Sequence, residues 1–280
     1  MRAATRGSFG KGFLGVLQLK VGYSTLCLLG EPFKRIEGYL ASTPEYLCEI
    51  LNDGFHLLDS QRIRVLNRVR DSHHLEYVMH LPFAGLNYAA SNPFLRRAAQ
   101  KMVLRALDQA VKLECSHVLI HSGQADPISS VFNPESAWRY TDEFLETVGK
   151  VATERGVQPL IENNFSPSYT LNSAEDMARF FGLGCSRYYK VALDIGHAFL
   201  TGDLNEFVER FRGSILELHI HDNRGQSDEH LALDEGMIPW RQTLERLLVN
   251  GFDGMAIVEN KDWNSNTKSC ERLKSFLHGT

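Results

Sequence analysis

Residues 118–121 read Val-Leu-Ile-His and residues 159–162 read Pro-Leu-Ile-Glu, so a short apolar, strand-like run ends each time on an ionisable residue. The same pattern recurs at residues 77–80, 191–194, 215–219 and 255–259, which end on His80, Asp194, His219 and Glu259. A buried strand normally ends in a turn residue, because an ionisable group beside a core must be paired or must bind something. Six such endings, with helix-like segments between them, predict one rim of a parallel α/β fold.

The whole chain alternates strand and helix patterns in this way. Strands are predicted over residues 20–28, 55–58, 75–80, 118–121, 158–162, 189–194, 215–221 and 255–259. Helices are predicted over residues 62–70, 93–113, 134–155, 174–182, 204–211 and 239–249, and a last one carries Cys270 and Leu273 inward. Eight strands alternating with helices favour a single-domain (β/α)8 TIM barrel over residues 19–280, with residues 1–18 as an N-terminal extension.

Composition sets the broad class. The chain has 280 residues, 43% of them hydrophobic and 23% charged, and a net charge of −4, so no overall basic field attracts nucleic acid. The five cysteines are scattered without a C-x-x-C pair, which favours reduced thiols and a cytoplasmic location. The basic and apolar N-terminus resembles a signal peptide only weakly, because its apolar run is short. No segment reaches the roughly 20 apolar residues of a membrane span.

The candidate site follows from the barrel, because functional residues lie at the C-terminal ends of barrel strands. Those positions hold His80, His121, Glu162, Asp194, His219 and Glu259, and the loops add His197, Asp228 and His230. One such residue alone is typical of a hydrogen-bonded structural group, but six on one rim indicate a metal site. Histidine and carboxylate ligands without cysteine suit zinc, manganese or a similar divalent ion. His221 and Asp222, which follow His219, could instead orient its ring from behind.

Several motifs resemble the xylose isomerase-like barrel superfamily over residues 19–280. They are Met79-His80-Leu81-Pro82, His121-Ser122-Gly123, Ile161-Glu162-Asn163-Asn164, Leu193-Asp194-Ile195-Gly196-His197, His219-Ile220-His221-Asp222-Asn223, Asp228-Glu229-His230-Leu231 with Gly236-Met237-Ile238-Pro239-Trp240, and Val258-Glu259-Asn260. The superfamily contains sugar-phosphate isomerases and epimerases and the endonuclease IV type of abasic-site nuclease. The resemblance implies one catalytic metal on Glu162, Asp194, His219 and Glu259 in the epimerase branch. In the nuclease branch it implies three zinc ions, which also use His80, His121, His197, Asp228 and His230.

Departures from the nuclease pattern favour the epimerase branch. After Glu162 the chain reads Asn163-Asn164-Phe165-Ser166-Pro167, where the nuclease continues Asn-Thr-Ala-Gly. Around Asp194 it reads Asp194-Ile195-Gly196-His197, where the nuclease has Asp-Thr-Cys-His. The predicted second strand ends at Asp59, where many relatives have a glutamate that contacts substrate. There is no phosphate-binding glycine loop after any predicted strand, which removes the usual support for a nucleotide enzyme.

The leading hypothesis is a metal-dependent isomerase or epimerase of a sugar, sugar phosphate or polyol, working through an enediolate. One divalent ion (Mn, Zn, Co or Mg) is expected and up to three are allowed, with Glu162 and Glu259 moving the proton on carbon. The expected substrate contacts are His80, His121, His197, Asp59 and Trp240, and the expected aromatic lid is Phe83, Phe165, Tyr169 and Trp240. The alternatives are an endonuclease IV-like phosphodiesterase acting on abasic DNA, a lyase and a binding protein. A nucleic-acid partner is expected only for the phosphodiesterase, no membrane partner is expected, and a homo-oligomer is left open.

Overall fold

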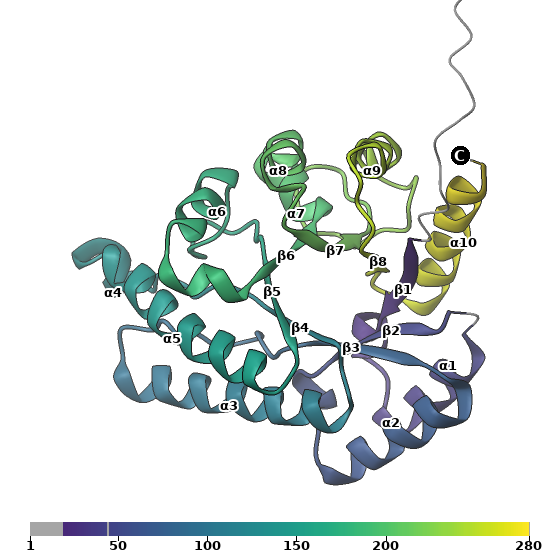
Figure 1. The fold of residues 1–280 in the computed structure, drawn as a ribbon, viewed down its shortest axis with the longest axis horizontal. Coiled ribbons are helices and arrows are strands. Elements are labelled where there is room, and N and C mark those ends of the chain that lie inside the picture. The colour runs from purple at the N-terminus through teal and green to yellow at the C-terminus, as the bar shows by residue number, and fades with distance from the viewer. Residues whose placement is uncertain (1–18, 44, 280) are drawn as a thin grey trace, which may run out of the picture.

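The computed structural model describes residues 19–43 and 45–279, and the predicted extension over residues 1–18 lies outside them. Eight parallel strands close into a barrel in the order β1 to β8, which confirms the predicted (β/α)8 architecture (Figure 1). The strands are β1 (Lys20–Ser24), β2 (Leu47–Leu51), β3 (Glu76–His80), β4 (His117–Ile120), β5 (Gln158–Glu162), β6 (Lys190–Asp194), β7 (Ile215–Ile220) and β8 (Met255–Val258). Every strand pairs with its sequence neighbour, and β8 returns to β1.

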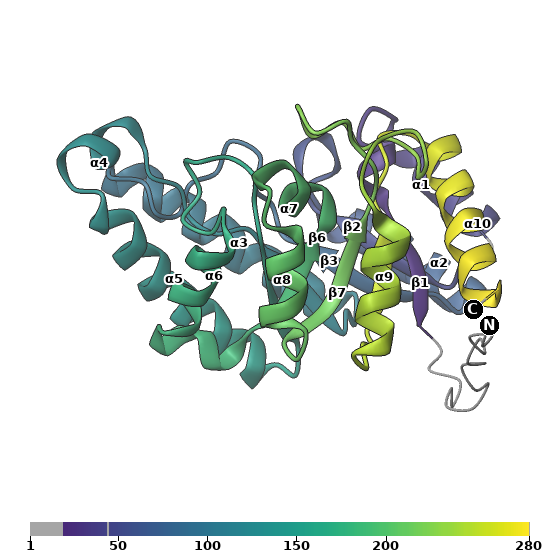
Figure 2. The ribbon, with the colours of Figure 1, turned by 90° about the horizontal axis from the view of Figure 1, so that it is seen from above.

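Helices surround the barrel on its outer side (Figures 1 and 2). They are α1 (Ile36–Ser42), α2 (Ser60–His73), α3 (Pro93–Lys112), α4 (Pro127–Phe132), α5 (Glu135–Glu154), α6 (Ala174–Phe181), α7 (Ile195–Thr201), α8 (Leu204–Phe211), α9 (Trp240–Val249) and α10 (Trp263–Gly279). α3 shows why these segments are helical. The Asn92 side chain accepts the backbone N–H of Phe94, Pro93 occupies the first turn, and Ala99, Val103 and Ala110 are buried on one face. None of the described helices is long and apolar enough to cross a membrane.

The second strand differs from its prediction. It is β2 (Leu47–Leu51), whereas the predicted residues 55–58 begin inside a 3-10 turn over Gly54–His56, whose Gly54 has a positive φ. Phe55 is 86% exposed and Leu57 40% exposed, and of the apolar side chains in this run only Leu58 is buried in the core. β2 was missed because Glu49 interrupts its apolar run, yet Glu49 is fully buried. The first strand is also shorter than predicted, since Ser24 caps a 3-10 turn over Thr25–Leu28.

The barrel interior is packed below its C-terminal rim. Small apolar clusters fill it, made of Leu47, Val78, Met255 and Ile257 on one side and Leu119, Leu160 and Ala192 on the other. Side chains alternate along a strand, so a residue two positions after an interior residue also points inward. Leu160 therefore precedes an inward Glu162, and Leu119 precedes an inward His121. The interior packing forms the floor of the site. The five cysteines are buried and unpaired, as the scattered pattern predicted.

Candidate metal centre

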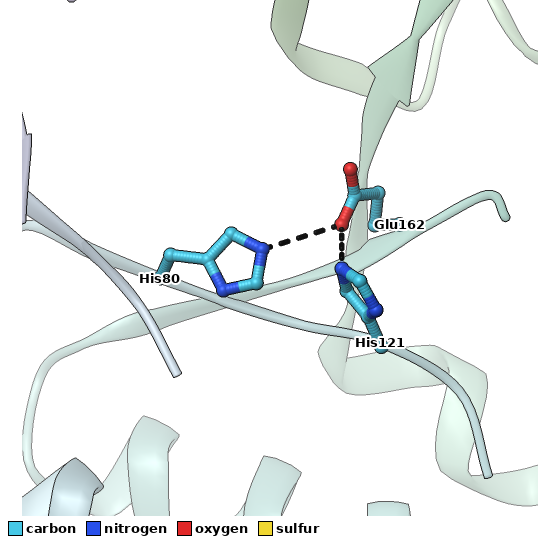
Figure 3. Close-up of side chains that lie close together, drawn as sticks. All are labelled: His80, His121 and Glu162. Atoms are coloured by element: carbon cyan, nitrogen blue, oxygen red, sulfur yellow. Dashed lines mark ion pairs between the residues drawn. The ribbon is translucent and has the colours of Figure 1, made fainter. Parts of the chain in front are cut away.

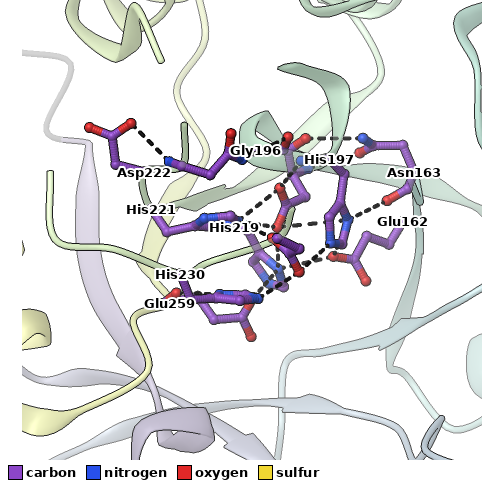
Figure 4. A network of polar contacts seen from close by, with 12 residues as sticks. Glu162, Asn163, Gly196, His197, His219, His221, Asp222, His230 and Glu259 are labelled. Carbon is purple, nitrogen blue, oxygen red and sulfur yellow. Dashed lines mark hydrogen bonds and ion pairs between the residues drawn. The ribbon is translucent and has the colours of Figure 1, made fainter. Parts of the chain in front are cut away.

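The predicted residues come together at the C-terminal end of the barrel, and Figure 4 labels Glu162, His197, His219, His230 and Glu259 among them. His80, Glu162 and Asp194 are the last residues of β3, β5 and β6, His219 lies near the end of β7, and His121 and Glu259 directly follow β4 and β8. Glu162, Asp194, His219 and Glu259 are at most 4% exposed, and we call these four the inner set. Four buried ionisable groups in one place need counter-charges or a ligand.

The three carboxylates of the inner set surround one atom of its fourth member, His219 Nδ1. Glu259 Oε2 lies 3.1 Å away, Glu162 Oε1 3.2 Å and Asp194 Oδ2 3.8 Å. Yet this nitrogen forms no hydrogen bond, although it is buried. Three carboxylate oxygens within 3.8 Å of one buried imidazole nitrogen form a compact set of donor atoms. The inner set therefore fits a divalent cation with one nitrogen and three oxygen donors.

Two further groups adjoin the inner set. On one side, Glu162 Oε2 lies 2.6 Å from His121 Nε2 and 3.5 Å from His80 Nε2 (Figure 3). On the other side, Asp228 Oδ2 lies 2.9 Å from His230 Nε2 and 3.3 Å from His197 Nε2. The structure thus brings together all nine predicted metal-ligand positions.

Backbone carbonyls fix the orientation of three of these histidines. The Nδ1 atom lies 2.8 Å from the Leu81 carbonyl in His80, 2.9 Å from the Asn163 carbonyl in His197 and 2.6 Å from the Glu259 carbonyl in His230. A carbonyl oxygen only accepts, so Nδ1 carries the proton in each case. In the neutral ring Nε2 then keeps a free lone pair, which is the usual preparation of a metal-binding histidine.

The buried histidines and carboxylates of the centre shift one another's pKa values. The pKa is raised to about 9 in His80, about 10 in His197 and about 9 in His230. Burial opposes the protonation of these rings, but the carboxylates around them outweigh it. Burial also opposes ionisation of Glu162 and Glu259, and the neighbouring histidines nevertheless hold the pKa of both below its usual range. His121 differs, because burial lowers its pKa.

Two asparagines, Asn163 and Asn260, each directly follow a glutamate of the inner set and hold neighbouring parts of the centre together. Asn163 accepts the backbone N–H of Asp194 at 2.8 Å and donates to its carbonyl at 3.0 Å, which joins β5 to β6. Asn260 donates to the carbonyls of His230 and Leu231, which holds the Asp228–His230 loop beside β8. In the sequence, the pairs Glu162-Asn163 and Glu259-Asn260 could have identified both asparagines as residues that support the centre.

Two buried acids behind His219 were missed by the sequence analysis. Glu217 Oε1 lies 3.1 Å and Glu49 Oε2 3.3 Å from His219 Nε2, on the side of the ring away from the inner set. Glu217 is two positions before His219 in β7, so strand alternation alone places both on the inner face. That spacing could have identified Glu217. Glu49 was hidden by the misplaced second strand.

Four residues have roles other than those expected. His221 does not hold His219, because its Nε2 lies 3.1 Å from both oxygens of Asp194. Asp222 instead accepts backbone N–H groups of Asn223, Gly236 and Ile238. Asp59 is exposed and caps α2, and Trp240 is buried, donating to Asp234 and packing against Phe276 of α10. The structure therefore does not bring Asp59 or Trp240 into the centre.

Three of the four predicted lid aromatics border the centre. Phe83 stacks on His121 with ring centroids 4.4 Å apart, Tyr169 meets the edge of His121 at 5.7 Å, and Phe165 lies 5.0 Å from the His197 ring. Asp53 fixes Phe83, since its carboxylate accepts the backbone N–H groups of Phe83 and Ala84 at 2.8 Å each. These rings give the polar centre an apolar wall.

The fold and the centre define a class of proteins, (β/α)8 barrels with a buried carboxylate and histidine centre at the strand ends. The xylose isomerase-like TIM barrel family matches residues 46–276, and the chain belongs to it. An uncharacterized Methanocaldococcus jannaschii protein, MJ1311, is 31% identical, over 94% of this chain and 90% of its own. Fructoselysine 3-epimerase of Shigella flexneri is 23% identical over 62% of each chain. A solved D-tagatose 3-epimerase-like protein superposes with a TM-score of 0.86 and 29% identity, over 93% of this chain and 97% of that one.

Proposed function

We propose that the chain is a divalent-metal-dependent isomerase or epimerase of a sugar, sugar phosphate or polyol. The observation that carries this proposal is the convergence of Glu162 and Glu259 on one point. They come from β5 and β8, which lie three places apart in the ring of strands, and both reach His219 Nδ1 at 3.1 to 3.2 Å. Two carboxylates that face one substrate carbon from different directions can remove a proton and return it on another side. The similarity to fructoselysine 3-epimerase and to a D-tagatose 3-epimerase-like protein supports this chemistry.

Glu162, Asp194, His219 and Glu259 would hold the catalytic ion. Their oxygen-rich donor set suits Mn, Co or Mg as well as Zn. When bound, the ion supplies Lewis acidity that makes the substrate C–H more acidic. The neighbouring histidines keep the pKa of both glutamates low in the metal-free protein, so each is available as a proton acceptor near neutral pH.

The remaining residues of the centre bind and enclose the substrate. His80, His121 and His197 present imidazole nitrogens to hydroxyl or carbonyl oxygens. Phe83 stacks on His121 and Phe165 lies beside His197, so both rings would reduce access of water to the reacting carbon. A sugar suits such a pocket because it offers apolar C–H faces as well as polar edges.

Solvent isotope exchange tests the proposal. A panel of ketoses and ketose phosphates is incubated with the Mn-loaded protein in D2O, and deuterium on carbon is measured by NMR. We expect incorporation into at least one substrate, and Glu162→Gln and Glu259→Gln should each abolish it. Glu143→Gln is the matched control, since this glutamate is exposed on α5. If no sugar exchanges, or if both Gln variants exchange at the wild-type rate, the proposal is wrong.

Metal-assisted hydrolysis of a phosphodiester is the second candidate. It is favoured by the adjoining groups around Glu162 and Asp228, which give the centre more ligand-type residues than one ion needs. The test is cleavage of a duplex that contains one abasic site. Cleavage without exchange into any sugar would support hydrolysis over isomerisation.

A further inference from the structure

His221 is a fully buried histidine to which the proposed reaction gives no role. It follows β7 and stacks on His230 with ring centroids 4.2 Å apart and an interplanar angle of 25° (Figure 4). Gly196, near the start of α7, leaves the space for the ring. A Cβ at residue 196 would lie 2.5 Å from His221 Nε2 and closer still to Cε1, which real contacts do not allow. The ring therefore fits here because residue 196 is glycine.

The one polar contact of His221 is with Asp194. Its Nε2 lies 3.1 Å from both carboxylate oxygens of Asp194, whereas Asp228 Oδ1 is 3.7 Å away and beyond hydrogen-bond range. An ionised carboxylate only accepts, so Nε2 carries a proton and donates it. Among the described residues, none forms a hydrogen bond with the buried Nδ1 of this ring. The His221 side chain is thus committed to a single carboxylate.

The place that His221 Nε2 occupies decides which atoms of Asp194 remain available. A position equidistant from both oxygens of a carboxylate is the one that a cation takes when it binds the two together, and here the imidazole N–H fills it. Oδ1 also accepts the backbone N–H of His197 at 2.7 Å, and Asn163 holds the Asp194 backbone on both sides. Oδ2 lies 3.8 Å from His219 Nδ1, within the inner set. Asp194 therefore offers the inner set one oxygen, Oδ2.

We propose that His221 is a positioning residue that makes Asp194 bind the ion of the inner set, which we call the inner ion, through Oδ2 alone. Ions such as Mn and Mg prefer an octahedral shell of about six ligands. Four side chains that each supply one atom leave about two of these positions for substrate oxygens, and a bidentate Asp194 would take one of them. His221 thus keeps a position on the ion open for the substrate. The inference deepens the proposed function and rests on its metal.

The number of water molecules on a bound Mn ion tests the proposal without any activity assay. The full-length protein is loaded with MnCl2, and Mn-bound water is counted by oxygen-17 relaxation. His221→Ala should carry one water fewer than the wild type, because the released carboxylate takes a second position. His221→Gln should keep the wild-type number, since its amide N–H reaches the place of His221 Nε2. His221→Asn, whose shorter amide reaches only the place of Nδ1, should behave like His221→Ala.

Gly196→Ala provides an independent variant, because it keeps the imidazole but its methyl group displaces the ring. It should also carry one water fewer. His73→Ala and Gly38→Ala are the matched controls, since both positions are exposed and a Cβ at residue 38 meets nothing. Circular dichroism checks that each variant is folded.

The competing explanation is that His221 only packs the loop after β7. His221→Ala and His221→Gln would then both lower Tm, and both would keep the wild-type number of waters. An unchanged number in His221→Ala and Gly196→Ala would overturn the proposal. If His221→Ala retains no Mn, equal numbers in His221→Gln and His221→Asn would overturn it. A wild type that retains no Mn would overturn the metal-dependent function itself, so the two failures are distinguishable.

Discussion

Replacing Glu217 tests how the protein prepares His219 for the inner ion. Glu217 Oε1 lies 3.1 Å and Glu49 Oε2 3.3 Å from His219 Nε2, so this nitrogen has two carboxylate acceptors. A proton held on Nε2 leaves Nδ1 free to face Glu162, Asp194 and Glu259. A carboxylate behind a metal-bound histidine also makes the ring a better ligand. Glu217→Leu should therefore weaken metal binding although residue 217 touches no ion.

The size of the effect follows from the two acceptors. Losing a group of this kind costs roughly 10- to 100-fold in metal affinity, or about 1.4 to 2.7 kcal/mol. Because Glu49 remains in Glu217→Leu, we expect a loss near the lower limit of that range, about 10-fold. The double variant Glu217→Leu/Glu49→Gln should approach the upper limit, about 100-fold. Glu217→Gln keeps an accepting oxygen and should lose least.

The assay is competition for Mn or Zn against a chromophoric chelator at pH 7.5. Thermal unfolding in the presence of EDTA separates metal affinity from stability of the fold. Burial raises the pKa of Glu217 to about 7. A carboxyl whose pKa is higher in the folded than in the unfolded state loses stability as the pH rises between the two values, so Glu217→Gln should be at least as stable as the wild type above pH 7. Wild-type affinity in Glu217→Leu and in the double variant would refute this reasoning.

Three further predictions concern the same centre. Glu162→Ala or Asp194→Ala should abolish retention of the inner ion, which in the wild type should lie about 2.0 to 2.3 Å from its ligands. Metal analysis after dialysis checks this prediction. A full equivalent of metal at this site in both variants would exclude the assignment. The metal-free protein should lose stability as the pH rises from about 6.5, the pKa of an unfolded histidine, to about 9 for His80 and about 10 for His197. Each raised pKa stabilises the fold fully below the unfolded-state value, and this stabilisation is lost once the pH passes the folded-state value. The Tm of the metal-free protein should fall over this range and recover on adding Mn, whereas a flat profile would contradict the coupling. Phe165→Ala should increase solvent access and lower the rate of isotope exchange several-fold with little change in Tm, because this ring is 41% exposed; an unchanged rate would show that it is not part of a lid.

Strand endings carried most of the information in the sequence. Glu162 and Asp194 were predictable because each closes an apolar run, and the C-terminal ends of parallel strands meet on one rim. The same reasoning failed at Glu49, which lies in the middle of β2 and reads as a break in an apolar run. It also misassigned Phe55 and Leu57, whose apolar side chains are exposed in and just after a 3-10 turn.

Contacts between distant loops were beyond sequence reasoning. Trp240 is the last residue of a motif that resembles the family, yet its indole packs against Phe276 of α10 and donates to Asp234. The stacking of His221 on His230 depends on how the loop after β7 folds back, which a bridge between Asp222 and Leu231 determines. Such placements arise from three-dimensional packing and leave no local pattern.

The packed floor of the barrel has a consequence for the order of events. Leu47, Val78 and Ile257 fill the interior on one side and Leu119 and Leu160 on the other, below the centre. An ion held by the inner set, as proposed, would then exchange at the C-terminal end of the barrel, where the proposed substrate would also enter and leave. The ion would have to bind before the substrate, and a bound substrate would block its escape. A bound substrate or inhibitor should therefore protect the protein from inactivation by a chelator. Loss of the ion should also be slower during turnover than in the free protein.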